Sequence, residues 1–193
     1  MWRETIRGVL NMNNQPNLYT ERLILRPFTL SDAHMVQHLA GNVKIAETTL
    51  NVPHPYEDGM AETWIGTHRE SFKEGKGVTY AIVNKSTNDL LGAIGLMINP
   101  SHRKAELGYW IGLPSWGNGY CTEASRALIG YGFNELNLNK ICAKALLTNT
   151  ASWTLMEKVG IIYEGTLRQE VIKDGIAYDL KTYAILKDEY FKS

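Results

Sequence analysis

The fold of this chain is decided by the stretch Leu113-Pro-Ser-Trp-Gly117-Asn118-Gly119-Tyr120-Cys121-Thr122-Glu123-Ala124, which runs from a strand through a glycine turn into a helix. Gly117 and Gly119 flank Asn118, so the backbone can turn tightly and bring successive N–H groups against an anion. The N-terminus of the following helix adds a partial positive charge at the same place. The stretch therefore predicts a phosphate-binding turn.

Two familiar phosphate motifs do not match this turn. No Lys-Ser/Thr pair follows the glycines, which excludes the nucleoside-triphosphate loop, and the third glycine of the dinucleotide fingerprint is missing. On spacing alone, a plain tight turn before a helix remains an open alternative.

Hydrophobic periodicity predicts seven strands and about four helices around the turn. Strands are expected over residues 19–28, 78–84, 90–99, 104–113, 140–147, 161–172 and 176–186. Helices are expected from residues 29–32 onward and over 57–72, 122–133 and 151–158. Because helices do not alternate with every strand, the pattern favours an α+β fold with a mixed sheet over a doubly wound one.

Length and composition predict one globular domain over residues 18–193, after a polar, flexible N-terminal arm over 1–17. Twenty basic residues balance twenty acidic ones, so we expect neither nucleic acid nor a membrane as a partner. The chain has no apolar stretch of membrane-spanning length and no signal-peptide pattern, which predicts a cytoplasmic protein. Cys121 and Cys142 are too few for a disulfide framework and are expected to be reduced.

Histidine spacing raises the question of a metal site. The five histidines include His34 and His38, four residues apart, as on one face of a helix. No carboxylate lies between them, so the zinc-peptidase pattern is absent. A solvated helix face explains the pair, and we expect no metal.

Three motifs together resemble one known family. Trp116 to Ala124, preceded by Glu106-Leu-Gly-Tyr-Trp-Ile-Gly112, is similar to the acetyl-CoA-binding motif of the GNAT superfamily, in its branch of ribosomal-protein N-terminal acetyltransferases (RimJ/RimL-like). The stretches 20–33 and 149–160 resemble the opening strand and helix and the later asparagine-to-serine helix of that branch. The resemblance covers about residues 19–186. Against the general superfamily pattern, Trp116 replaces Gln or Arg at the start of the turn, and Cys121 replaces Gly or Ala at its end.

The resemblance implies a fold, a cofactor and its ligands. It implies a mostly antiparallel GNAT sheet, splayed between the fourth and fifth expected strands, 104–113 and 140–147. It implies acetyl-CoA as donor and coenzyme A as product, with a backbone cradle for the pyrophosphate at Gly117, Asn118, Gly119, Tyr120, Cys121 and Thr122. The strand before the turn would pair with the pantetheine arm through Tyr109, Trp110 and Ile111, and Asn149 would contact the same arm.

The favoured acceptor is a protein N-terminal α-amine. A small amine, such as a polyamine, amino sugar or amino acid, is the alternative acceptor, because the cofactor motifs cannot separate the two. A non-catalytic acyl-CoA-binding module that retains the fold is the alternative from another functional class. The protein is expected to act as a monomer or homodimer.

Glu106 is the candidate general base. Counting by two along the strand puts Leu107 and Tyr109 on one face and Glu106, Gly108 and Trp110 on the other, which is open enough for a ligand. A carboxylate there can take a proton from the amine directly or through a water. The resemblance carries a glutamate at this position, whereas an ion pair with a neighbouring basic residue, Arg103 or Lys104, is the structural alternative.

Ser152 is the candidate acid for the leaving thiolate, as the resemblance implies, with Tyr163 as a second possible donor. Asn149 and Ser152, three residues apart at a helix start, are equally typical of helix N-caps.

Three further residues are weighed for roles around the site. His54 and Tyr56 lie in a loop that overhangs the acceptor pocket in this family and would shape substrate choice, although His54-Pro-Tyr56 also reads as a structural turn. A nucleophilic role for Cys121 is disfavoured, because no histidine lies near it in the sequence.

Overall fold

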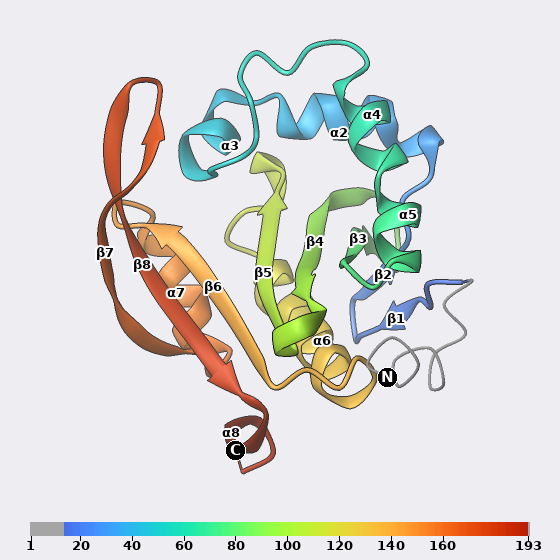
Figure 1. Ribbon diagram of the computed structural model, residues 1–193. Coiled ribbons are helices and arrows are strands. Elements are labelled where there is room, and N and C mark those ends of the chain that lie inside the picture. Colours follow the sequence, from blue (N-terminus) through green and yellow to red (C-terminus); the bar gives the residue numbers. More distant parts are fainter. Residues whose placement is uncertain (1–13, 193) are drawn as a thin grey trace.

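The structure, a computed structural model, describes residues 14–192 and is built on one eight-stranded sheet (Figure 1). Residues 1–13, most of the expected N-terminal arm, lie outside the described residues. The strands are β1 (Leu18–Tyr19), β2 (Leu23–Arg26), β3 (Gly77–Asn84), β4 (Leu90–Asn99), β5 (Lys104–Ile111), β6 (Lys140–Leu146), β7 (Ile162–Lys173) and β8 (Ile176–Leu186). Their order in the sheet is β1-β2-β3-β4-β5-β6-β8-β7.

The mixed, mostly antiparallel sheet expected from the sequence is confirmed, with eight strands instead of about seven. The extra strand arises because the expected strand 19–28 is interrupted by a turn, in which the Thr20 N–H donates to the Leu23 carbonyl at 3.0 Å. The short β1 then pairs back on β2.

The sheet splays where its two central strands meet. β5 and β6 are parallel, and their pairing runs only from Lys104 and Lys140 to Leu107 and Ala143. Beyond that point β5 follows β4 and β6 follows β8, so the two strands diverge (Figure 1). The splay lies between the fourth and fifth of the expected strands, as predicted.

Seven α-helices lie within residues 14–192: α2 (Ala33–Ala40), α3 (Val43–Thr48), α4 (Met60–Gly66), α5 (His68–Lys73), α6 (Tyr120–Asn134), α7 (Thr150–Lys158) and α8 (Lys187–Tyr190). The expected helix 57–72 is two helices, because the chain breaks at Thr67, whose hydroxyl donates to the Trp64 carbonyl at 2.7 Å. The one-turn α8 and the short α3 were not expected. None of the helices in this part of the chain is long and apolar enough to cross a bilayer.

The sheet carries a hydrophobic core on each face, and β5 contributes to both. Leu107 and Ile111 belong to the larger core, where α6 and α7 pack. Trp110 belongs to the smaller core, beneath α2, α3 and α4. The alternation read from the sequence therefore holds in β5, and the face of Trp110 is covered at that point rather than open.

Candidate active site

The glycine turn leaves the N-terminus of α6 open. Gly117 and Gly119 have φ angles of 77° and 76°, which L-residues rarely adopt, so glycine is needed at both positions. Gly119 precedes Tyr120, the first residue of this 15-residue helix, and no side chain caps the first turn. A Cβ built on Gly117 would meet no atom within 4 Å. The first N–H groups of α6 are thus available to an anion such as a pyrophosphate.

A charged cluster joins the glycine turn and α6 to the turn between β1 and β2. The Arg22 guanidinium donates to the Glu123 carboxylate at 2.7 Å and to the Asn118 carbonyl at 3.1 Å. Thr20 donates to the same carboxylate at 2.6 Å. Burial alone would raise the pKa of Glu123, but these hydrogen bonds outweigh it and lower the pKa. No local pattern in the sequence indicates this cluster, because about a hundred residues separate its two halves.

Hydrogen bonds define which residues of β5 face the splay. The Ala105 carbonyl accepts from the Cys142 thiol of β6 at 3.3 Å, whereas the N–H of Gly112, the residue after β5, donates to the Leu91 carbonyl of β4 at 2.8 Å. Because strand residues alternate in direction, odd-numbered residues of β5 turn their backbone groups toward β6 and even-numbered residues toward β4.

Beyond the last pair with β6, the odd-numbered residues of β5 are Tyr109 and Ile111, and their backbone groups face the open side. The Ile111 carbonyl already accepts from the Trp116 indole N–H at 2.6 Å. The backbone of Trp110 faces β4, and its side chain is buried in the smaller core. Of the three residues expected along the pantetheine arm, the structure brings Tyr109 and Ile111 to the edge but not Trp110.

Glu106 lies where β5 still pairs with β6, and its side chain is 33% exposed. Its carboxylate is 4.0 Å from the Lys144 ammonium of β6, which is also 3.6 Å from the Glu170 carboxylate of β7. The partner of Glu106 is thus Lys144 and not Arg103 or Lys104, the two neighbours in the sequence. Cross-strand neighbours depend on register and cannot be read from adjacent positions.

At the start of α7, Asn149 makes two hydrogen bonds. Its side-chain oxygen accepts from the Ser152 N–H at 3.1 Å, which confirms the N-cap interpretation. Its amide group donates to the Thr48 carbonyl at the end of α3, at 2.9 Å. The Ser152 hydroxyl lies 2.9 Å from the Tyr109 hydroxyl. The structure thus brings Ser152 together with one of the residues on the edge of β5.

Burial keeps two groups near the turn protonated. It raises the pKa of the Cys121 thiol to about 12, although Cys121 lies in the first turn of α6, where the helix dipole favours a thiolate. Burial also raises the pKa of the Tyr109 phenol. A neutral thiol at Cys121 agrees with a packing role rather than a nucleophilic one.

Three other candidate residues make local contacts. The Tyr163 hydroxyl pairs with Thr166 of its own strand at 2.7 Å. One ring nitrogen of His54 lies 3.2 Å from the Gly41 carbonyl. Tyr56 packs against the smaller core, where burial raises the pKa of its phenol. The contacts of His54 and Tyr56 are those of a structural turn packed on the protein, the second interpretation of this loop.

A bridge joins the β7–β8 hairpin to α3. The Lys173 ammonium, at the tip of the hairpin, donates to the carbonyls of Ala46 and Thr49. Together with the bond from Asn149 to Thr48, it connects α3 to both β7 and α7 across the open side of the splay (Figure 1). No pattern in the sequence indicates this bridge.

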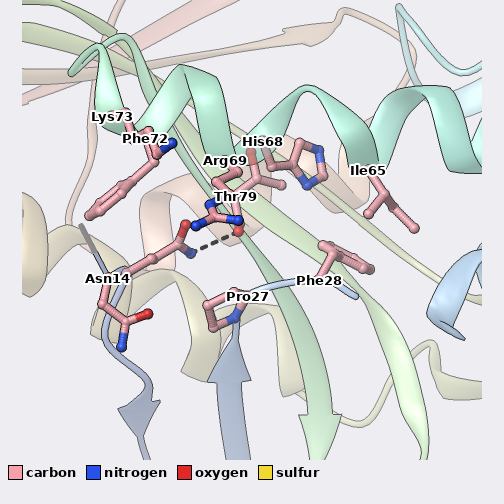
Figure 2. A pocket seen from close by; sticks show the side chains of 10 residues that line it. Asn14, Pro27, Phe28, Ile65, His68, Arg69, Phe72, Lys73 and Thr79 are labelled. Atoms are coloured by element: carbon pink, nitrogen blue, oxygen red, sulfur yellow. Dashed lines mark hydrogen bonds between the residues drawn. The ribbon is translucent and has the colours of Figure 1, made fainter. Parts of the chain in front are cut away.

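A separate cavity of about 190 Å³ lies beside α5 (Figure 2). It is lined by Asn14, Gln15, Pro27, Phe28, Ile65, His68, Arg69, Phe72, Lys73 and Thr79. No residue of β5, β6, α6 or α7 contributes to its lining, so it is not the site of the glycine turn. Within residues 14–192, no group of three His, Cys, Asp or Glu side chains could hold a metal ion.

Comparisons with known proteins agree with this geometry. A family model, the acetyltransferase (GNAT) domain, matches residues 22–162. A putative ribosomal N-acetyltransferase of Bacillus subtilis, YdaF, is 34% identical over 134 residues, which cover 69% of this chain and 72% of the relative. A spermidine N(1)-acetyltransferase of Vibrio cholerae is 28% identical and covers 88% of this chain and 95% of the relative.

The fold is shared with a solved acetyltransferase. The structure of RimL, a ribosomal L7/L12 α-N-protein acetyltransferase in complex with coenzyme A, superposes with a TM-score of 0.80. The match covers 90% of this chain and 99% of that one at 19% identity, and so concerns the fold alone.

Proposed function

Because the chain belongs to the GNAT family and uses acetyl-CoA as its acetyl donor, we propose that it acetylates protein N-terminal α-amines of the ribosomal-protein type. The observation that carries the proposal is the open edge of β5 beside the uncapped N-terminus of α6, within motifs that resemble the RimJ/RimL-like branch. The relative YdaF, whose name is that of a ribosomal N-acetyltransferase, supports the same class of acceptor. A polyamine is the second candidate, favoured by the Vibrio relative.

The described residues fit the cofactor. The first N–H groups of α6, over residues 120–122, and the turn at Gly117 to Gly119 suit a pyrophosphate. A Cβ built on Gly108 would meet no atom within 4 Å, so a ligand can approach β5 closely there. Tyr109 presents its backbone groups to the open side of the splay, as an added strand would require. When bound, acetyl-CoA supplies an acetyl group activated as a thioester.

The chain's own residues then move two protons. Glu106 accepts a proton from the acceptor amine, directly or through a water, as the C–N bond forms and the C–S bond breaks. Ser152 gives its hydroxyl proton to the departing sulfur and recovers one from water. Glu106 releases its proton to solvent, so the net transfer is one proton from the amine to the thiol.

A thiol-release assay with acetyl-CoA tests the acceptor class. The panel contains short peptides with different free N-termini, the same peptides with blocked N-termini, and small amines that include spermidine. We expect turnover with a subset of the free peptides and none with their blocked forms. Turnover with small amines alone would contradict the protein-acceptor proposal, and no binding of coenzyme A in calorimetry would contradict the cofactor site.

A further inference from the structure

The hydrogen bond at the start of α7 holds the backbone of Ser152 and not its side-chain hydroxyl. The Ser152 backbone N–H donates to the Asn149 side-chain oxygen at 3.1 Å, within the first turn of α7. The rotamer about χ1 and the direction of the O–H bond decide whether the hydroxyl proton can reach a thiolate. A second group is needed to fix them.

Tyr109 is that second group. Its hydroxyl donates to the Ser152 carbonyl oxygen at 3.2 Å and lies 2.9 Å from the Ser152 Oγ, a contact in which either hydroxyl can donate, although the two residues are 43 apart in the sequence. The Tyr109 ring is half-buried against the larger core, so the phenol has little freedom to move away.

The same residue touches both parts of the site. The backbone of Tyr109 faces the splay where the pantetheine arm is expected, and its side chain reaches α7. The phenol can thus set the position of the serine relative to the edge of β5.

We propose that Tyr109 is a positioning residue that donates a hydrogen bond to the Ser152 Oγ and so directs the serine's own proton toward the leaving sulfur. The inference rests on the proposed function, in which Ser152 is the proton donor. The phenol has one proton, which a three-centre bond can share between the Ser152 carbonyl oxygen at 3.2 Å and the nearer Oγ at 2.9 Å. When the Oγ accepts in this way, the serine proton is not used in that bond and is left to donate elsewhere. Burial raises the pKa of Tyr109, so the phenol keeps its proton and remains a donor rather than a proton relay.

The test compares kcat and KM in four variants: Tyr109→Phe, Ser152→Ala, the double variant, and Tyr183→Phe. The last is a matched control, because the Tyr183 hydroxyl donates to Glu157 in the same helix α7 at 3.1 Å, away from Ser152. The assay uses acetyl-CoA with the panel acceptor that supports turnover. Calorimetry with coenzyme A and thermal melts check binding and folding.

We expect Tyr109→Phe to lower kcat about 3- to 10-fold, the effect of one lost hydrogen bond, with the KM for acetyl-CoA within about 2-fold of the wild type. Ser152→Ala should lower kcat by about 10²-fold, and adding Tyr109→Phe to it should cause no further loss. Tyr183→Phe should stay within about 2-fold of the wild type.

Three outcomes would overturn the inference while leaving acetyl transfer intact. These are a wild-type kcat in Tyr109→Phe, the same fall in kcat in the Ser152→Ala background, or an equal fall in Tyr183→Phe. Wild-type protein that binds no coenzyme A and releases no thiol would instead overturn the proposed function itself, and this inference with it.

Discussion

At the scale of single residues, Glu106 and Glu170 share one cation, the Lys144 ammonium, at 4.0 and 3.6 Å. The two carboxylates differ in position, because Glu106 lies on β5 just before the splay and Glu170 lies on β7. Their contacts with Lys144 are longer than direct hydrogen bonds, and all three side chains are partly exposed. The ion pairs themselves therefore add little to stability.

This difference predicts unequal effects of removing each charge. We expect Glu106→Gln to lower kcat/KM by about 10²-fold or more, because the amide cannot accept the amine's proton. Glu170→Gln, which loses a charge beside the same lysine, should stay within about 3-fold of the wild type, as is usual for exposed ion pairs. Steady-state kinetics with the panel acceptor measure both, and full turnover in Glu106→Gln would show that the glutamate is not the base.

At the scale of elements, the turn into α6 depends on backbone geometry that only glycine adopts without strain. Gly119 has a φ of 76°, and Gly160, after α7, has a φ of 83° with no atom within 4 Å of a built Cβ. The two glycines thus share a left-handed backbone conformation in which another residue would be strained, but only Gly119 belongs to the open N-terminus of α6.

We expect Gly119→Ala to weaken the binding of coenzyme A about 10-fold or more, because relaxing the turn moves the N–H groups that face the pyrophosphate. Gly160→Ala should lower the free energy of unfolding by roughly 1–2 kcal/mol, as Gly119→Ala should, and leave the affinity for coenzyme A unchanged. Calorimetry and chemical unfolding separate the two quantities. Equal loss of affinity in both variants would mean that the effect is general destabilisation.

At the scale of the whole molecule, the free energy of unfolding should depend on pH through a histidine that the site does not use. His68 of α5 packs against Trp64 and Phe28 and lines the cavity beside α5 (Figure 2). Neither of its ring nitrogens has a hydrogen-bond partner among the described residues. Burial lowers the pKa of His68 to about 4, so the ring is neutral in the folded state at neutral pH.

The sign of the effect follows from the direction of the shift. An unfolded histidine takes up a proton near pH 6.5, before the folded one does, so the free energy of unfolding should fall as the pH drops from about 6.5 to 4. At pH 5 the loss is on the order of 2 kcal/mol relative to pH 7. Urea unfolding of the wild type and of His68→Leu at pH 5 and pH 7 measures this loss. The variant should lose less free energy of unfolding between the two pH values than the wild type does. Identical pH dependence in the two proteins would contradict the assignment.

Asp32 affects the free energy of unfolding only at a lower pH than His68 does, so the two contributions can be measured separately. Burial alone would raise the pKa of Asp32, but the hydrogen bonds from Arg26 and Thr29 lower it below its usual value. Its contribution is therefore present above about pH 4 and is lost as the pH falls further.

Local features of this protein were readable from the sequence alone. The glycine turn, the start of α6 and the alternation along β5 depend on residues a few positions apart, whose backbone preferences and side-chain directions are intrinsic. The motifs around them were enough to indicate the family and its cofactor. The strand and helix order also followed, apart from the short helices α3 and α8 and two breaks. The breaks lie at residues 20–22 and at Thr67, where hydroxyl and backbone hydrogen bonds end an otherwise regular pattern.

Contacts between distant segments were decided only by the tertiary structure. The position of Tyr109 beside Ser152, the pairing of Glu106 with Lys144 and the bond from Asn149 to Thr48 all join elements far apart in the sequence. They depend on strand register and helix packing, and a shift of one residue along a strand would point every side chain to the other face. The sequence determined which chemical groups this protein has, whereas packing determined which of them meet, because distance in space follows from the fold and not from spacing along the chain.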